Sequence, residues 1–231
     1  IRIIALLLRQ FLERELRLCE VAPHHLGNRG SVHRLGFDVR MMRLLDQLVE
    51  DVGSNGHSSP AAIWLPRSMF LYEDAAGWQE KYRTSLVASQ WLGCSLDETS
   101  YRDSWILKGL AEYCGYWFYE LSSKDQKTCE MMLNDVRKYV LYGSGAGSMG
   151  VKAGPMVLGT RLNSSRSNDY APNVIYKSAY IFHMIRYLMR DYKTGSDDLF
   201  IAFLKDIVRT YRNRTISTED FRQMMEKHLY P

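Results

Sequence analysis

The stretch SLVASQWLGCSLDETSYRDSWILKGLAEY, residues 85–113, decides the fold of this 231-residue chain. Its apolar residues fall at helical spacing on both sides of a short polar connection, which predicts two helices in succession. Aromatic residues and glycines punctuate the two segments at Trp91, Gly93, Trp105, Gly109 and Tyr113. The stretch contains no histidine, although the packing pattern around it is detailed.

The composition is that of a folded protein with one sizeable domain, or a main domain with an appendage: 46% of the residues are hydrophobic and 24% are charged. The formal charge is only +4, with 30 basic residues scattered among 26 acidic ones, which argues against a nucleic-acid partner. The four cysteines lack C-x-x-C spacing, and no apolar run approaches the roughly 18 to 20 residues of a membrane span. Localisation stays open.

Periodicity predicts an α+β, helix-rich protein with a small β element in its first third. A strand is predicted in PAAIWLP, residues 60–66, and helices are predicted at about 2–18, 37–52, 79–92, 101–121, 123–142, 173–191, 197–211 and 217–228. The glycine-rich residues 143–155 lack a G-K-[ST] ending, which favours a flexible connection over a phosphate site. STED, residues 217–220, is a capping box that starts the last helix.

Three blocks of sequence resemble the M1 aminopeptidases, the gluzincin family with H-E-x-x-H, eighteen further residues and a glutamate. The first block is Q-W-x-G at 90–93 with W-x-x-K-G-x-A-x-Y at 105–113. The second and third, GPMVLGTRLNSS at 154–165 and VIYKSAYIFHMIRYLMRD at 174–191, are similar to the bacterial branch. The resemblance implies a thermolysin-like catalytic domain over residues 56–231, a small sheet region followed by a helical bundle. Residues 1–55 are placed only as an N-terminal helical segment.

A zinc peptidase needs two histidines four residues apart, a neighbouring carboxylate as proton acceptor and a third ligand from another helix. The resemblance puts the two histidine positions on Ser85 and Ser89, the catalytic glutamate on Leu86 and the third ligand on Lys108. Serine hydroxyls are not usual zinc ligands, leucine cannot accept a proton, and a lysine cation repels a metal cation. The sequence therefore predicts no zinc, no catalytic residue and no cofactor.

Two further positions bear on the old site. The transition-state tyrosine of the family falls on Ile175, and Tyr176 stands one residue away, so it substitutes only if the turn shifts. Lys108 and Glu112 are four residues apart on one helix face, which predicts an ion pair that fills the old site.

We expect a catalytically inactive M1 homologue, a pseudoenzyme that serves as a structural or protein-interaction subunit of a larger assembly with other protein subunits as partners. One alternative is a binding module that holds peptides in the old cleft without cleaving them. A second alternative is a hydrolase that uses Ser85 or Ser89 as nucleophile with Lys108 as base. An active-site probe that labels either serine would identify the hydrolase, and a peptide-binding screen would identify the module.

Overall fold

The computed structural model describes residues 47–51, 56–59, 62–66, 69, 74, 76–93, 95–123, 125–143, 145, 147–162 and 169–230. The helix predicted at 2–18 and the first ten residues of the one predicted at 37–52 lie outside these ranges.

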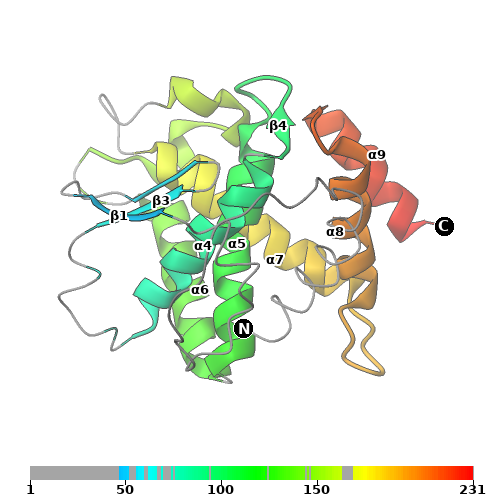
Figure 1. Cartoon of the computed structure of the whole chain (residues 1–231), viewed down its shortest axis with the longest axis horizontal. Coiled ribbons are helices and arrows are strands. Elements are labelled where there is room, and N and C mark those ends of the chain that lie inside the picture. Colours follow the sequence, from blue (N-terminus) through cyan, green and yellow to red (C-terminus); the bar gives the residue numbers. More distant parts are fainter. Residues whose placement is uncertain are drawn as a thin grey trace, which may run out of the picture.

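Helices make up most of the described chain (Figure 1). Their bounds are α4 Trp78–Leu92, α5 Ser104–Ser123, α6 Gln126–Tyr142, α7 Lys177–Met189, α8 Asp198–Tyr211 and α9 Thr218–Leu229, with short turns η1 Gly150–Ala153, η2 Met156–Arg161 and η3 Ala171–Tyr176. The six helices predicted from residue 79 onward are confirmed within a few residues. The capping box of α9 is also present, because Ser217 and Asp220 bond each other's backbone amides. Among the helices of the described residues, none is long and apolar enough to cross a membrane.

A three-stranded mixed sheet precedes the helices. Its central strand is β3 (Ala62–Pro66), which pairs in parallel with β1 (Gln47–Asp51) and antiparallel with β2 (His57–Ser59). The predicted strand at 60–66 is therefore confirmed over residues 62–66. The prediction of a helix at 37–52 is wrong for residues 47–51, where pairing with β3 overrides a locally helical pattern.

A second, two-stranded sheet joins distant parts of the chain and was not predicted. β4 (Asp97–Glu98) pairs in parallel with β5 (Thr215–Ile216), and the amide of Thr99 donates to the carbonyl of Ile216 at 3.2 Å. Strands of two residues carry no periodicity that a sequence could display. Their pairing brings the start of α5 to the start of α9.

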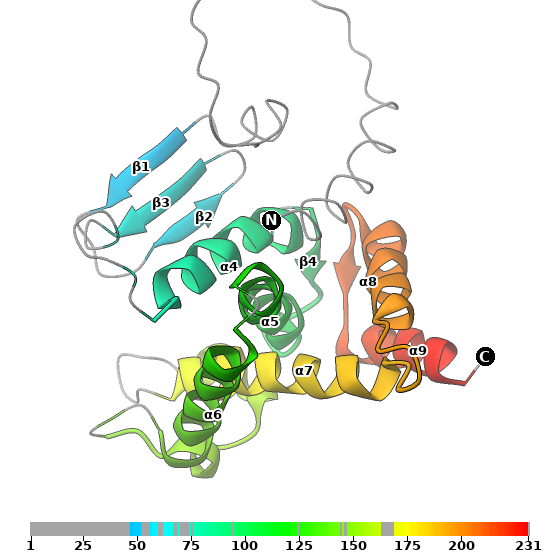
Figure 2. The same cartoon turned by 90° about the horizontal axis from the view of Figure 1, so that it is seen from below.

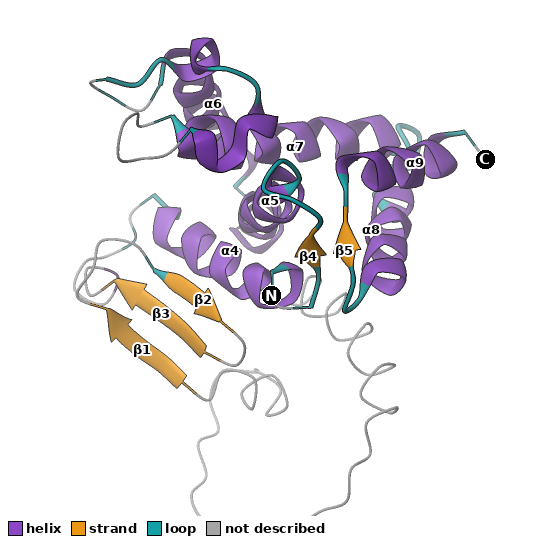
Figure 3. Ribbon diagram, turned by 90° about the horizontal axis from the view of Figure 1, so that it is seen from above, coloured by secondary structure: helices purple, strands orange, loops and turns teal. Residues whose placement is uncertain are grey.

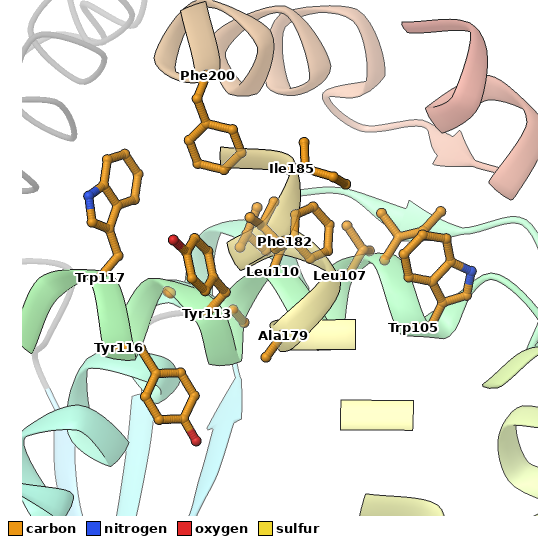
Figure 4. Close-up of a cluster of buried hydrophobic side chains, with 14 of the residues drawn as sticks. Trp105, Leu107, Leu110, Tyr113, Tyr116, Trp117, Ala179, Phe182, Ile185 and Phe200 are labelled. Atoms are coloured by element: carbon orange, nitrogen blue, oxygen red, sulfur yellow. The ribbon is translucent and has the colours of Figure 1, made fainter. Parts of the chain in front are cut away.

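Helix α5 lies at the centre of the molecule, between α4 on the sheet side and α7 on the other side (Figures 2 and 3). On the α7 side it buries a cluster that includes Trp105, Leu110 and Tyr113, with Phe182 of α7 and Phe200 of α8 packed above them (Figure 4). All five side chains are at most 5% exposed. The main core therefore lies between α5, α7 and α8.

The residues of the M1-like pattern in α5 belong to this core. Gly109 permits close approach of α7, because a Cβ atom there would lie 2.3 Å from Cβ of Ser178. The indole Nε1 of Trp105 donates to Oγ1 of Thr218 at 3.0 Å, which ties α5 to the start of α9. Tyr113 accepts a hydrogen bond from buried Arg186 of α7 at 3.3 Å. These pattern residues build the scaffold.

Candidate functional site

The other side of α5 meets α4, the helix that carries Ser85 and Ser89. The two helices approach closely at Gly115, where a Cβ atom would lie 2.5 Å from the backbone oxygen of Lys81 and 2.4 Å from Oγ of Ser85. Only glycine leaves room for this contact. Tyr116 points to this side of α5, away from Tyr113 (Figure 4).

A buried ion pair occupies the interface between α4 and α5. Nζ of Lys81 bonds Oε1 of Glu112, and the two residues are only 4% and 7% exposed. The phenol of Tyr116 donates to the same carboxylate oxygen at 3.1 Å, and the Lys81 ammonium lies 4.4 Å from the centre of that ring. Burial lowers the pKa of Lys81, and the charge of Glu112 acts in the opposite direction. Burial also raises the pKa of Tyr116 well above its usual value, and Glu112 adds to the effect.

The predicted pair between Lys108 and Glu112 is wrong, because each residue has a different partner. Glu112 pairs with Lys81, whereas Nζ of exposed Lys108 bonds the phenol oxygen of Tyr170 and lies 5.1 Å from its ring centre. Glu112 does form a Lys–Glu pair, but its lysine comes from the neighbouring helix α4. The sequence held a signal for this lysine: residues 81, 85 and 89 share one helix face, so Lys81 stands one turn from a ligand position.

The two serines at the histidine positions bond their own helix. Oγ of Ser85 donates to the backbone oxygen of Lys81 at 3.1 Å, and Oγ of Ser89 donates to that of Ser85 at 2.9 Å. Ser85 is also only 6% exposed. The structure does not bring either hydroxyl into a hydrogen bond with Lys108, so the Ser–Lys pair of the hydrolase alternative is not assembled among these residues.

Leu86, at the position of the catalytic glutamate, packs toward the sheet. A Cβ atom at Gly56 would lie 2.8 Å from its Cδ1 atom, just before β2 begins. On the same face of α4, the phenol oxygen of Tyr82 accepts the amide of Gly56 at 2.9 Å. The position that the resemblance assigns to the proton acceptor thus carries an apolar side chain.

Ile175 and Tyr176 end the wide π-helical turn η3. The ring of Tyr176 lies 6.1 Å from that of Tyr139 on α6. Burial raises the pKa of Tyr176 to about 12, and Glu112 contributes to the shift. The phenol is therefore protonated near neutral pH.

The glycine-rich connection is anchored to η3 by Asp169. Its Oδ1 accepts the amides of Met149 and Gly150 at 2.7 and 2.9 Å, and Nδ2 of Asn173 donates to the backbone oxygen of Gly150 at 2.9 Å. These two backbone amides, which could otherwise bind a phosphate, thus donate to a carboxylate of the same chain. The described part of this connection is more ordered than the predicted flexible linker.

The described ranges contain no group of three histidine, cysteine, aspartate or glutamate residues placed to hold a metal. At the three positions that the resemblance assigns to ligands, two neutral hydroxyls and one ammonium offer no anionic donor. The residue types present do not fit a zinc ion, whose protein ligands are thiolate, imidazole and carboxylate.

Solved structures show which fold this is. An M1 zinc metallopeptidase mutant from Deinococcus radiodurans with a bound Tyr-Ser-Ala substrate is 19% identical with a TM-score of 0.57, and the match covers 88% of this chain and 43% of that chain. The M1 zinc metallopeptidase from the same organism matches at 20% identity and TM-score 0.56, over 87% and 42% of the two chains. A two-domain M1 zinc metallopeptidase mutant bound to L-tryptophan matches at 17% and 0.55, over 87% and 43%.

The described chain thus has an M1-peptidase-like fold, and identity this low shows the fold alone. The chain spans less than half the length of the peptidases it matches. No family profile and no curated protein matches the sequence.

Proposed function

We propose that this protein is an M1-peptidase-like pseudoenzyme that does not hydrolyse peptides and serves as a structural or protein-interaction subunit of a larger assembly. The observation that carries the proposal is the buried Lys81–Glu112 pair, whose two residues stand one helical turn from Ser85 and Lys108, the positions that the resemblance assigns to metal ligands. Zinc-activated water and a carboxylate base are the two main sources of rate in such peptidases. At these positions, no residue is suited to bind the zinc or to act as the carboxylate base.

The arrangement at the old site also favours a stable core over a reactive one. The cation of Lys81 is neutralised by Glu112, and the phenol of Tyr116 adds a hydrogen bond to the same carboxylate. A buried pair with satisfied hydrogen bonds fixes one arrangement of two helices. Scaffold residues such as Gly109 and Trp105 keep their packing roles on the opposite side of α5.

Two measurements on the native protein test the proposal. Metal analysis is expected to find no stoichiometric zinc, and an aminoacyl arylamide substrate is expected to stay uncleaved. The protein is further expected to co-purify in a complex of defined size, because a subunit requires partners. Stoichiometric zinc with chelator-sensitive hydrolysis would overturn the proposal. So would a zinc-free protein in which a serine-directed probe labels Ser85 or Ser89.

A non-cleaving peptide-binding module is the second candidate. Lys108 favours it, because this exposed cation stands at a former metal-ligand position with only the phenol of Tyr170 as its partner among the described residues. A peptide that binds with measurable affinity and is recovered uncleaved would distinguish this role from a purely structural one.

A further inference from the structure

Two cation–tyrosine clusters lie near the beginning of α5. In the first, the side chains of Arg102 and Arg161 both contact the ring of Tyr101, with Cζ atoms 5.8 and 5.4 Å from the ring centre. Nε of Arg102 also donates to the phenol oxygen at 3.4 Å. In the second, Lys108 bonds Tyr170 as described above. We call these five residues the cation–tyrosine surface.

The first cluster is held together by the backbone. Gly159 of η2 has φ 51°, and a Cβ atom there would lie 2.2 Å from the backbone oxygen of Tyr101. Arg161 follows two residues later, so this tight contact fixes its position relative to Tyr101 and Arg102. The two arginines therefore share one phenol because of the fold, and their meeting does not depend on side-chain flexibility alone.

The two clusters are joined through η2, which carries Arg161, and η3, which begins just after Tyr170, because these turns pack against α5 and against each other. Oγ of Ser104 donates to the backbone oxygen of Tyr101 at 2.9 Å, which gives residues 101–104 the geometry of a helical turn. Ser104 and Lys108 are then four residues apart on one face. Arg102 and Lys108 are six residues apart along the chain, so their backbone atoms lie within the length that an extended peptide of about six residues can cover.

No carboxylate of the described residues lies within ion-pair distance of the cations of this surface, although the charge of Asp103 acts on Arg102. Arg102, Arg161 and Lys108 are exposed, and none of them forms an ion pair with a carboxylate in the described ranges. Asp103 is the carboxylate next to Arg102, but it is buried and accepts hydrogen bonds from Ser100 and Thr218. Arg102 and, to a smaller extent, Arg161 lower the pKa of the Tyr101 phenol, because both favour its anion.

We propose that the cation–tyrosine surface docks an acidic, Asp- or Glu-rich segment of a partner protein. Charge complementarity selects the occupant: three exposed cations match carboxylates, and arginine with tyrosine is the composition found at energetically important interface positions. Tyr101 and Tyr170 supply amphipathic contact area beside the charges. The inference rests on the proposed interaction role and names the chemistry of the partner.

The test measures binding of a fluorescein-labelled hexaglutamate peptide to the full chain by fluorescence anisotropy. The triple variant Arg102→Gln, Lys108→Gln, Arg161→Gln removes the three cations. The control triple variant Arg83→Gln, Lys127→Gln, Arg137→Gln removes the same charge from exposed positions on α4 and α6. We expect the first variant to lose at least about tenfold in affinity and the control to lose less than about threefold, with binding weakened by added salt.

Equal losses in both variants would overturn the inference, because they would show a response to net charge alone. Absence of peptide binding would overturn it as well. Tighter binding of inorganic phosphate or of a single-stranded oligonucleotide through the same three cations would assign the surface to another ligand. Zinc content and arylamide hydrolysis of the same preparation test the pseudoenzyme role separately, so either idea can fail alone.

Discussion

Helix α5 buries a cation on each of its two packed sides, and the two sites differ in how they are built. On the α7 side, Arg186 is 1% exposed and bonds Glu120 and Asp197, each at 2.6 Å, with the ring of Trp117 5.0 Å from its guanidinium. On the α4 side, Lys81 has one carboxylate, Glu112. On the α7 side, one planar guanidinium connects α5, α7 and the residue that precedes α8. On the α4 side, one ammonium connects α4 and α5.

The M1-like sequence pattern follows this division. Trp105, Gly109 and Tyr113 all pack on the α7 side, whereas the positions that the resemblance assigns to zinc ligands and base lie on α4 or on the remaining faces of α5. Separate helix faces thus carry the scaffold pattern and the assigned site positions, so the one can be kept while the other changes. Substitutions at the two buried cations test this difference between the two sides of α5.

The largest expected effect is on the α7 side. Arg186→Met should lower the free energy of unfolding by about 3–5 kcal/mol, because two carboxylates lose their buried partner. Urea denaturation measures the change. Arg190→Met is the matched control: this residue approaches Asp197 only at 3.7 Å and is partly exposed, so its loss should cost less than about 1 kcal/mol. Equal losses would show that Arg186 contributes little through its charge.

Lys81→Met should cost about 3 kcal/mol, because Glu112 is left buried without a cation. The double variant Lys81→Met, Glu112→Gln removes the uncompensated charge and keeps an acceptor for Tyr116. It should recover at least about half of the loss in urea denaturation. A double variant as unstable as the single one would mean that lost packing, not charge, causes the effect.

High pH should destabilise both sides of α5 through buried tyrosines. Burial raises the pKa of Tyr176 to about 12 and the pKa of Tyr113 and Tyr116 above their usual value. Because their folded pKa exceeds the unfolded value, their stabilising contribution is complete below pH about 10 and is lost as pH rises through the folded pKa.

Each such tyrosine lowers the free energy of unfolding by about 1.4 kcal/mol per pH unit in that window. The lowered pKa of Lys81 acts in the opposite direction but involves one group. Urea denaturation between pH 8 and pH 11 measures the slope, and Tyr113→Phe or Tyr116→Phe should each reduce it. An unchanged slope in both variants would contradict the assignment.

The smallest effect is expected for Lys108→Met. Lys108 is exposed and bonds only a phenol, so its removal should change the free energy of unfolding by less than about 0.5 kcal/mol. The comparison with Lys81→Met decides which lysine neutralises Glu112. A larger loss for Lys108→Met than for Lys81→Met would restore the pair expected from the spacing on α5.

The helices from residue 79 onward were predictable because their apolar periodicity extends over many turns. The strand at 47–51 was not predictable, because its apolar residues follow a helical pattern and only the pairing with β3 makes the segment a strand. The same limit applies at the site. An i, i+4 spacing suggested Lys108 for Glu112, but the interhelical contact at Gly115 brings Lys81 there instead. Spacing shows which residues share a helix face, whereas the partners they bond depend on how closely neighbouring helices pack.

The resemblance assigned positions to the metal ligands, but the environment of each position could not be predicted. The hydrogen bonds of Ser85 and Ser89 to their own helix, and the π turn that ends at Tyr176, depend on backbone geometry that no residue type announces. The position of Lys81 was predictable, because residues 81, 85 and 89 are spaced four apart and so share one face of α4.

The zinc content of the purified native protein, measured together with arylamide hydrolysis, tests the central claim most directly. The claim is that the M1-like scaffold persists while a Lys81–Glu112 pair replaces the metal site. It predicts substoichiometric zinc, no hydrolysis and no loss of stability on treatment with a chelator. One zinc ion per chain, removed by the chelator together with peptidase activity, would contradict it.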